Sequence, residues 1–255
     1  MPASQIAAQM YTLRDHTKTP VDIARTLARV RAIGYQAVQL SALGPIDPAE
    51  LAKILRNEGL AVAATHTSPE RLDTDTQRVI DEHHAWGCAL TAIGGYFKET
   101  QSAKDWNDFA ASFNRIAGKF AGSGVAVGYH NHSHELVRYD GKTALQHLTE
   151  LLDQPIWFEI DTYWIAHGGG DPRAWISALT GRVPAVHLKD MSINQKREQK
   201  MAEVGEGNLN WPGILQACKD AGTQWYIVEQ DDCNGLDPFD CLATSLRNLK
   251  AMGLN

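Results

Sequence analysis

The sequence of 255 residues has few cysteines and no pairing pattern among them. The four cysteines, at positions 88, 218, 233 and 241, form no CxxC motif, which favours reduced thiols over a disulfide framework. No run approaches the roughly 18 apolar residues of a membrane span. The opening segment, MPASQIAAQMYTLRD, also lacks the basic and apolar regions of a secretory signal. We therefore expect a cytoplasmic protein with no membrane partner.

Positive charge is also scarce. Lys and Arg number 24 against 30 Asp and Glu, for a net charge of −6 with neutral histidines. The densest basic group, Lys196 and Arg197 with Lys200, lies in one polar segment. Non-specific binding of DNA or RNA requires a basic surface, so we expect no nucleic-acid partner.

Short apolar runs alternate with longer amphipathic segments along the chain. The runs begin near residues 6, 36, 61, 89, 124, 157, 183 and 224. Helical patterns between them cover residues 20–32, 47–58, 70–86, 102–122, 142–153, 172–180, 210–221 and 238–252. This alternation is typical of a parallel sheet covered by helices, and eight units in about 250 residues match a (β/α)8 barrel. We predict one α/β domain, a TIM barrel over residues 1–255, with 190–210 as a polar loop.

Capping residues support these boundaries. Asp47-Pro48 and Asp171-Pro172 are typical of helix starts. A glycine follows several of the predicted helices, at Gly34, Gly59, Gly87 and Gly222, as at helix C-termini. An open doubly wound sheet is the alternative, but it often carries a glycine-rich phosphate loop after its first strand. Here MYTLRDHTKT follows that strand, so the barrel is favoured.

Three acid or imidazole side chains each come at the end of an apolar run. They are Asp161 in WFEIDTYW, His187 in VPAVHLKD and Glu229 in WYIVEQDD. Taken singly, they are most simply a helix cap, a core histidine and an ion-pair partner of Lys189. Their repetition at strand ends, which meet at one rim of a barrel, favours a shared site. Carboxylates with imidazole suit one divalent metal ion, Mn²⁺, Co²⁺, Zn²⁺ or Mg²⁺, and the pattern does not choose among these.

The fifth apolar run ends in a histidine cluster, VAVGYHNHSHEL, which also contains Glu135. Because successive strand side chains point to opposite faces, His130 and His132 share one face, and Tyr129 and Asn131 share the other. One of these pairs should face the lumen. An imidazole there could bind the cation or only donate a hydrogen bond to a neighbouring carboxylate.

Other polar residues lie at strand ends on the same expected rim. They are Gln9, Tyr11, Gln39, His66 and Lys189. His66, in VAATHTS, could hydrogen-bond a sugar hydroxyl or shuttle a proton. Trp164 could offer an apolar face to a sugar ring, with simple packing as its alternative role.

Several stretches together resemble the sugar phosphate isomerase/epimerase family, which has a xylose isomerase-like TIM barrel. The stretches are AAQMYTLRD, GYHNHSHEL, IDTYWIAHGGGDP, HLKD, EVGEGNLNW and WYIVEQDD. They span nearly the whole chain in the family's order. The superfamily includes ketose epimerases, aldose–ketose isomerases, inosose and dehydroshikimate dehydratases and endonuclease IV. GYHNHSHEL resembles the branch near inosose dehydratase-like and keto-glycoside-cleaving proteins.

The resemblance implies a divalent cation held by four strand ends. The family's strand-six Asp, strand-seven His and strand-eight Glu match Asp161, His187 and Glu229. Its strand-five Glu falls at Tyr129 or His130, and we expect His130 as the fourth ligand. The family's epimerases use two opposed glutamates, and only one of them, Glu229, has a counterpart here.

We expect a metal-dependent isomerase or epimerase that acts on a keto sugar or keto-polyol, a small-molecule carbohydrate. The expected catalytic residues are Glu229 as base, one imidazole among His132, His66 and His130 as proton donor, and Lys189 beside the developing negative charge. The expected substrate contacts are Gln9, Tyr129, Glu135 and Trp164.

Three alternatives to this function use the same barrel. One is a lyase or dehydratase working by β-elimination, and another is a non-catalytic carbohydrate-binding barrel. A phosphodiesterase of the endonuclease IV kind is the third, and the charge of −6 argues against it. Whether the chain forms a homo-oligomer stays open.

Overall fold

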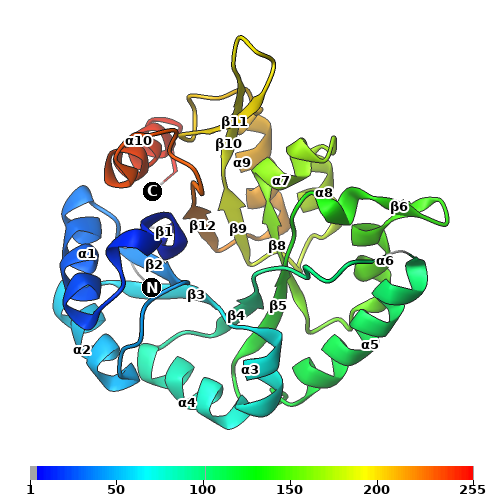
Figure 1. Cartoon of the computed structure of the whole chain (residues 1–255), viewed down its shortest axis with the longest axis horizontal. Helices are drawn as coiled ribbons and strands as arrows, with labels where there is room; N and C mark the ends of the chain where they lie inside the picture. The colour runs from blue at the N-terminus through cyan, green and yellow to red at the C-terminus, as the bar shows by residue number, and fades with distance from the viewer. Residues whose placement is uncertain (1–4, 101, 255) are drawn as a thin grey trace.

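A computed structural model describes residues 5–100 and 102–254. Eight parallel strands close into a barrel in the order β1-β12-β9-β8-β5-β4-β3-β2, and helices surround it (Figure 1). The strands are β1 (Ile6–Gln9), β2 (Ala37–Leu40), β3 (Ala61–His66), β4 (Leu90–Ile93), β5 (Ala126–His130), β8 (Trp157–Asp161), β9 (Ala185–Leu188) and β12 (Trp225–Val228). The predicted (β/α)8 barrel is confirmed.

The helices follow the strands in the predicted alternation. They are α1 (Pro20–Ile33), α2 (Pro48–Glu58), α3 (Pro69–Thr74), α4 (Thr76–Trp86), α5 (Ala103–Gly118), α6 (Ala144–Leu151), α7 (Thr162–His167), α8 (Pro172–Ala178), α9 (Trp211–Ala221) and α10 (Pro238–Ala251). The segment 70–86, predicted as one helix, forms α3 and α4 because Asp75 leaves helical geometry, with φ −115° and ψ 28°. The short α7 was not predicted. Within the described residues, no helix is long and apolar enough to cross a membrane.

The predicted helix caps are present. The Asp47 carboxylate accepts hydrogen bonds from the backbone N–H groups of Ala49 and Glu50 at the start of α2. Asp171 accepts from the N–H of Arg173 at the start of α8. The four predicted C-terminal glycines all have positive φ, between 65° and 117°, a conformation that glycine adopts without steric cost.

Several shorter elements lie outside the barrel sheet. They are the 3-10 helices η1 (Met10–His16) and η2 (His134–Leu136) and the strands β6 (Arg138–Tyr139), β7 (Lys142–Thr143), β10 (Asp190–Ile193) and β11 (Gln199–Ala202). The segment 190–210, predicted as a loop, thus contains the antiparallel hairpin β10–β11, which projects from the barrel (Figure 1). The buried Asp190 carboxylate anchors it by accepting from the N–H groups of Gly205, Gly207 and Leu209 and from Trp211 Nε1.

The barrel interior has an apolar floor made mainly of alanines. This floor consists of Ala7, Ala37, Ala63, Ala64, Ala92, Trp157, Ala185 and Ile227. The Trp157 indole fills the space that the alanines leave, and a Cβ at Gly128 would lie 2.3 Å from its ring. Because strand side chains repeat every two residues, the next inward residues are polar, including Gln9, Gln39 and Glu159. The functional groups therefore stand on a packed apolar layer.

Candidate active site

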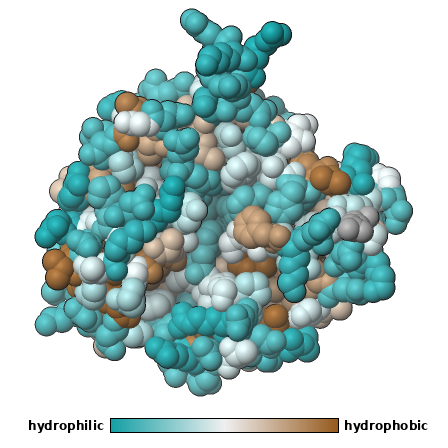
Figure 2. All heavy atoms as spheres, in the orientation of Figure 1, coloured by the Kyte–Doolittle hydropathy of each residue, from teal (hydrophilic) through white to brown (hydrophobic). Residues whose placement is uncertain are grey.

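A cavity of about 420 Å³ opens where the barrel strands end. The face seen in Figure 1 is largely hydrophilic and is hollowed near its centre (Figure 2). The cavity is lined by Tyr11, Ser41, His66, Gly94, Phe97, His130, His132, Trp164, Lys189, Glu229 and Asp231. Its volume is in the range of small-molecule binding sites.

Four side chains at the ends of four adjacent strands cluster together, and two of them, His130 and Glu229, line the cavity. His130, Asp161, His187 and Glu229 each place one potential ligand atom within 4.8 Å of the others. His187 Nδ1 lies 2.8 Å from Glu229 Oε2 and 3.7 Å from Asp161 Oδ2. His130 Nε2 lies 3.8 Å from Asp161 Oδ2. The structure thus brings together the four residues that the sequence analysis predicted as metal ligands.

The donor atoms of this cluster suit a divalent cation. Asp161 Oδ2 and His187 Nδ1 are buried and make no aligned hydrogen bond to a described residue. Charged groups lie close to both, with Lys189 Nζ 3.1 Å from the first and Glu229 Oε2 2.8 Å from the second, and buried polar atoms require such a charge or an ion. Burial raises the pKa of Asp161, but Lys189 and His187 outweigh it and lower the pKa below its usual value. Asp161 is therefore a carboxylate, and carboxylates with imidazole are ligands for Mn²⁺, Co²⁺, Zn²⁺ or Mg²⁺.

Lys189 supplies the positive charge of the cavity. Its Nζ lies 2.6 Å from Glu229 Oε2, 3.1 Å from Asp161 Oδ2 and 3.0 Å from Asp231 Oδ2. Burial lowers the pKa of Lys189, but these carboxylates raise it well above its usual value, so the group is an ammonium. Asp231 was missed by the sequence analysis, although it follows Glu229 by one strand period. Burial and the Glu229 charge raise the pKa of Asp231 to about 6.

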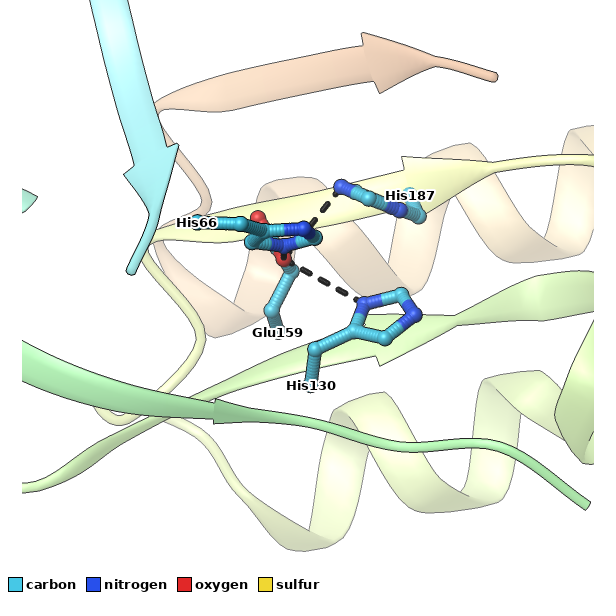
Figure 3. A group of neighbouring side chains, drawn as sticks. All are labelled: His66, His130, Glu159 and His187. Carbon is cyan, nitrogen blue, oxygen red and sulfur yellow. Dashed lines mark hydrogen bonds and ion pairs between the residues drawn. The ribbon is translucent and has the colours of Figure 1, made fainter. Parts of the chain in front are cut away.

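A second carboxylate, Glu159, lies on the same face of β8 as Asp161 and was also missed. It is fully buried, and it faces the rings of His66, His130 and His187 (Figure 3). Burial raises its pKa, but His187 and His66 outweigh it and hold the pKa well below the usual range. The spacing in WFEID, with Glu two residues before Asp161, was the signal that could have revealed it.

Two predicted proton donors and one predicted aromatic contact line the cavity. His66 is close to Ser41, whose Oγ lies 3.4 Å from His66 Nδ1. The His132 ring centroid lies 5.1 Å from that of Trp164 and 4.9 Å from that of Phe97. Burial, with the charges of His130 and Lys189, lowers the pKa of His132 to about 2. His132 is therefore a neutral ring among aromatic groups.

Three predicted substrate contacts lie elsewhere, which corrects the sequence analysis. Gln9 is fully buried below the cavity, where its Nε2 donates to Gln39 Oε1 at 2.8 Å. Tyr129 points to the outer face of β5, packs against Phe109 of α5, and donates its hydroxyl proton to Glu135 Oε1 at 2.6 Å.

Glu135 also accepts from the backbone N–H of His132 at 2.9 Å. Glu135 therefore holds the loop after β5 in place from the helix side of the strand, and it does not reach the cavity. Alternation along β5 explains the outcome for both residues, since the lumen receives His130 and the helix layer receives Tyr129.

The family model described as xylose isomerase-like TIM barrel matches residues 27–252, and this chain belongs to that family. The rhizopine catabolism protein MocC of Rhizobium meliloti is 21% identical, over 92% of this chain and 82% of that protein. Inosose dehydratase of Serratia proteamaculans is 21% identical, over 85% of each. A solved sugar phosphate isomerase/epimerase structure from Parabacteroides distasonis superposes with a TM-score of 0.83 at 22% identity, covering 98% of this chain and 95% of that one.

Proposed function

We propose that this protein is a metal-dependent enzyme that isomerises or epimerises a keto sugar or keto-polyol. One observation carries the proposal. A single cavity is lined by the Glu229 carboxylate and the imidazoles of His66 and His130, and Asp161 and His187 complete a donor set suited to a divalent cation directly behind its wall. In the barrel ring, β12, which precedes Glu229, and β3, which ends at His66, are separated by β1 and β2. The two groups can therefore approach a bound substrate from different sides.

The proposed ligands are His130, Asp161, His187 and Glu229. A divalent cation held there would polarise a substrate carbonyl and offset the charge that develops on its oxygen. Glu229 takes the proton from the neighbouring carbon. Although burial raises the pKa of Glu229, Lys189 and His187 hold it well below its usual range, so the group is an ionised carboxylate at neutral pH, as a base must be.

His66, protonated on both ring nitrogens, delivers a proton to the other face of the substrate or to the adjacent carbon, while Glu229 keeps the proton that it removed. It lines the cavity and has the Glu159 carboxylate 2.6 Å behind its Nε2, the arrangement of an imidazole oriented for acid–base work. We assign His132 a contact role instead, because its low pKa makes it a poor donor. Lys189 stabilises negative charge on the substrate, and Trp164 offers an apolar face to the ring.

The relatives support the substrate class. The names of the compared proteins refer to sugar phosphates and inososes, and both compound types can present a carbonyl beside a carbon that bears hydrogen and hydroxyl. The cavity volume accommodates one such ring with its hydroxyl groups.

Proton exchange in D₂O tests the proposal directly. Keto sugars and keto-inositols are incubated with the protein and each of Mn²⁺, Co²⁺, Zn²⁺ and Mg²⁺, and deuterium at carbon is followed by NMR. The wild-type protein should label one substrate class, and Glu229→Gln should lower the rate by at least about a hundredfold. Glu150→Gln, at an exposed ion pair with Lys142, is the matched control. A Glu229→Gln rate within tenfold of wild type would refute the base assignment.

A lyase reaction on the same site is the second candidate, favoured by the similarity to inosose dehydratase over 85% of both chains. After Glu229 removes the proton, the electron pair forms a carbon–carbon double bond, and the β-oxygen leaves with a proton from His66. Mass spectrometry of the products separates the two reactions, since elimination loses water or an alcohol and epimerisation conserves mass. Binding of a sugar without exchange or product would indicate a non-catalytic carbohydrate-binding barrel.

A further inference from the structure

We infer that Glu159 is a positioning residue that fixes an N–H on one particular ring nitrogen of His66, His130 and His187. In His66 and His130 the other, outward nitrogen is then bare, whereas the outward Nδ1 of His187 lies 2.8 Å from Glu229 Oε2 and carries a proton of its own until an ion takes its place. The inference rests on the proposed function in one respect, because the outward nitrogens of His130 and His187 are the proposed metal-binding atoms.

The first support is the group of three imidazoles around this carboxylate, of which His66 is hydrogen-bonded to it and the other two lie within ion-pair distance. Glu159 is fully buried, and an ionised carboxylate only accepts hydrogen bonds. His66 Nε2 lies 2.6 Å from Oε2, and His130 Nδ1 and His187 Nε2 each lie 3.2 Å from the same oxygen. Figure 3 shows the three rings, from three different strands, grouped around the one acid. A bare nitrogen turned toward Glu159 would set a lone pair against a negative charge.

The second support is Gln39, whose side-chain amide connects Glu159 to His187 and determines that His187 Nε2 carries a proton. Because Glu159 Oε1 can only accept, the group 2.8 Å away must be the Gln39 amide nitrogen. This orientation leaves Gln39 Oε1 to accept from Gln9 Nε2 at 2.8 Å and from His187 Nε2 at 2.5 Å. The Nε2 of His187 therefore carries a proton, and its Nδ1 is the atom that faces Glu229 and Asp161.

The outward nitrogens of His130 and His187 then match the metal-binding role proposed for them, and the outward Nδ1 of His66 takes up a proton before that ring donates one to the substrate, an uptake that the carboxylate behind the ring favours. His66 Nδ1 faces Ser41 Oγ across 3.4 Å in the cavity wall, where the hydroxyl can donate to it. His130 Nε2 faces Asp161 Oδ2. A carboxylate behind a metal-binding histidine fixes its tautomer and ring orientation and raises its basicity. Glu159 does this for two proposed ligands and one proposed acid–base group at once.

Glu159→Gln tests the inference with almost no change of shape. Its amide has one accepting oxygen and a donating nitrogen, so a ring that faces the nitrogen must turn its own proton outward. The matched control is Glu82→Gln, another buried glutamate, which pairs with Arg71 and Arg78 outside the cavity. ¹⁵N NMR of the imidazoles in metal-free protein, at about pH 8 where an ordinary imidazole is neutral, identifies the protonated nitrogen. Mn²⁺ affinity is measured in parallel by EPR.

We expect wild type and Glu82→Gln to carry the proton on Nε2 of His66 and on Nδ1 of His130. Glu159→Gln should move it to the other nitrogen in at least one of these rings and weaken Mn²⁺ binding by about 10–100-fold. Wild-type protein with the His130 proton on Nε2 would overturn the inference, and so would a folded Glu159→Gln with unchanged tautomers and affinity. If wild type binds no Mn²⁺, the proposed metal function fails, while the tautomers still decide the role of Glu159.

Discussion

The Lys189 ammonium lies 2.6 Å from Glu229 Oε2, with both side chains almost completely buried. The same nitrogen is 3.1 Å from Asp161 Oδ2. Two of the four proposed metal ligands are therefore paired with the protein's own cation. Asp231 Oδ2 also lies 3.0 Å from the ammonium, so Lys189 keeps this ion-pair partner when Asp161 and Glu229 bind an ion.

Replacing Lys189 by methionine should destabilise the metal-free protein and strengthen its response to metal. Removal of one partner leaves buried carboxylates uncompensated, at a cost of about 3–5 kcal/mol, which lowers Tm by on the order of 10 °C. A divalent ion no longer meets a competing ammonium, so Mn²⁺ should raise Tm more in Lys189→Met than in wild type. Thermal melts with and without Mn²⁺ measure both effects.

The control for that experiment is Lys142→Met. Lys142 pairs with Glu150 at the surface, where both side chains are about half exposed, and such pairs contribute about 0–1 kcal/mol. Its Tm should stay close to that of wild type. If metal-free Lys189→Met had the same Tm as this control, Lys189 would not compensate the charge of the cluster.

Metal content should depend on the clustered carboxylates. Wild-type protein should retain about one divalent ion per chain after purification, and Asp161→Ala/Glu229→Ala should retain none. Inductively coupled plasma mass spectrometry counts the ions, and circular dichroism confirms that the double variant is folded. Equal metal content in both proteins, or no uptake by wild type with any of the four cations, would contradict the proposed site.

The floor of the barrel should not tolerate a side chain at Gly128. A Cβ there would lie 2.3 Å from the Trp157 ring, so Gly128→Ala must displace the indole or the backbone, at a cost of about 1–3 kcal/mol or more. Gly118, in the last turn of α5, has open space around the same position, and Gly118→Ala should stabilise slightly, by about 0.5–1 kcal/mol. Urea unfolding compares the two, and a neutral Gly128→Ala would mean that Trp157 can move freely.

Stability should fall in acid partly through His83, which lies on α4 outside the cavity. Its Nδ1 donates to the Val79 carbonyl, its Nε2 lies 2.8 Å from the Thr65 hydroxyl oxygen, and burial lowers its pKa. In the unfolded state the imidazole has a pKa of about 6.5, so it binds a proton at a pH where the folded state does not. The stabilisation is present above about pH 6.5 and is lost as the pH falls from there toward the folded pKa.

His83→Gln should therefore weaken the dependence of Tm on pH between about 7 and 5. The exposed neighbour His84, which reaches the Ser123 carbonyl, supplies the control variant His84→Gln. Melting curves across this range compare the three proteins. A His83→Gln curve parallel to that of wild type would show that His83 accepts its proton in the folded state.

Local patterns were sufficient for the barrel but incomplete for the site. Asp161, His187 and Glu229 could be found because each ends an apolar run, and such ends meet at one rim in a parallel barrel. Glu159 escaped notice because it lies inside its run, where a single acid resembles an interruption of a buried strand. Tyr129 and Glu135 were misplaced because the phase of β5 is set by packing against α5, which a strand's own alternation does not reveal.

The sequence by itself determined the alternation of strands and helices, the caps that bound the helices, and the strand ends that carry acids and imidazoles. These features depend on residues close together in the chain, whose propensities and periodicity act locally. Only the tertiary structure decided that Gln39 joins Glu159 and His187, which lie 120 and 148 positions away. Closure of the barrel brings these three residues to the same level along the barrel axis. The register shift between β2 and β3 at Val38/Gln39 contributes to this alignment, and so to the hydrogen bonds that Gln39 makes.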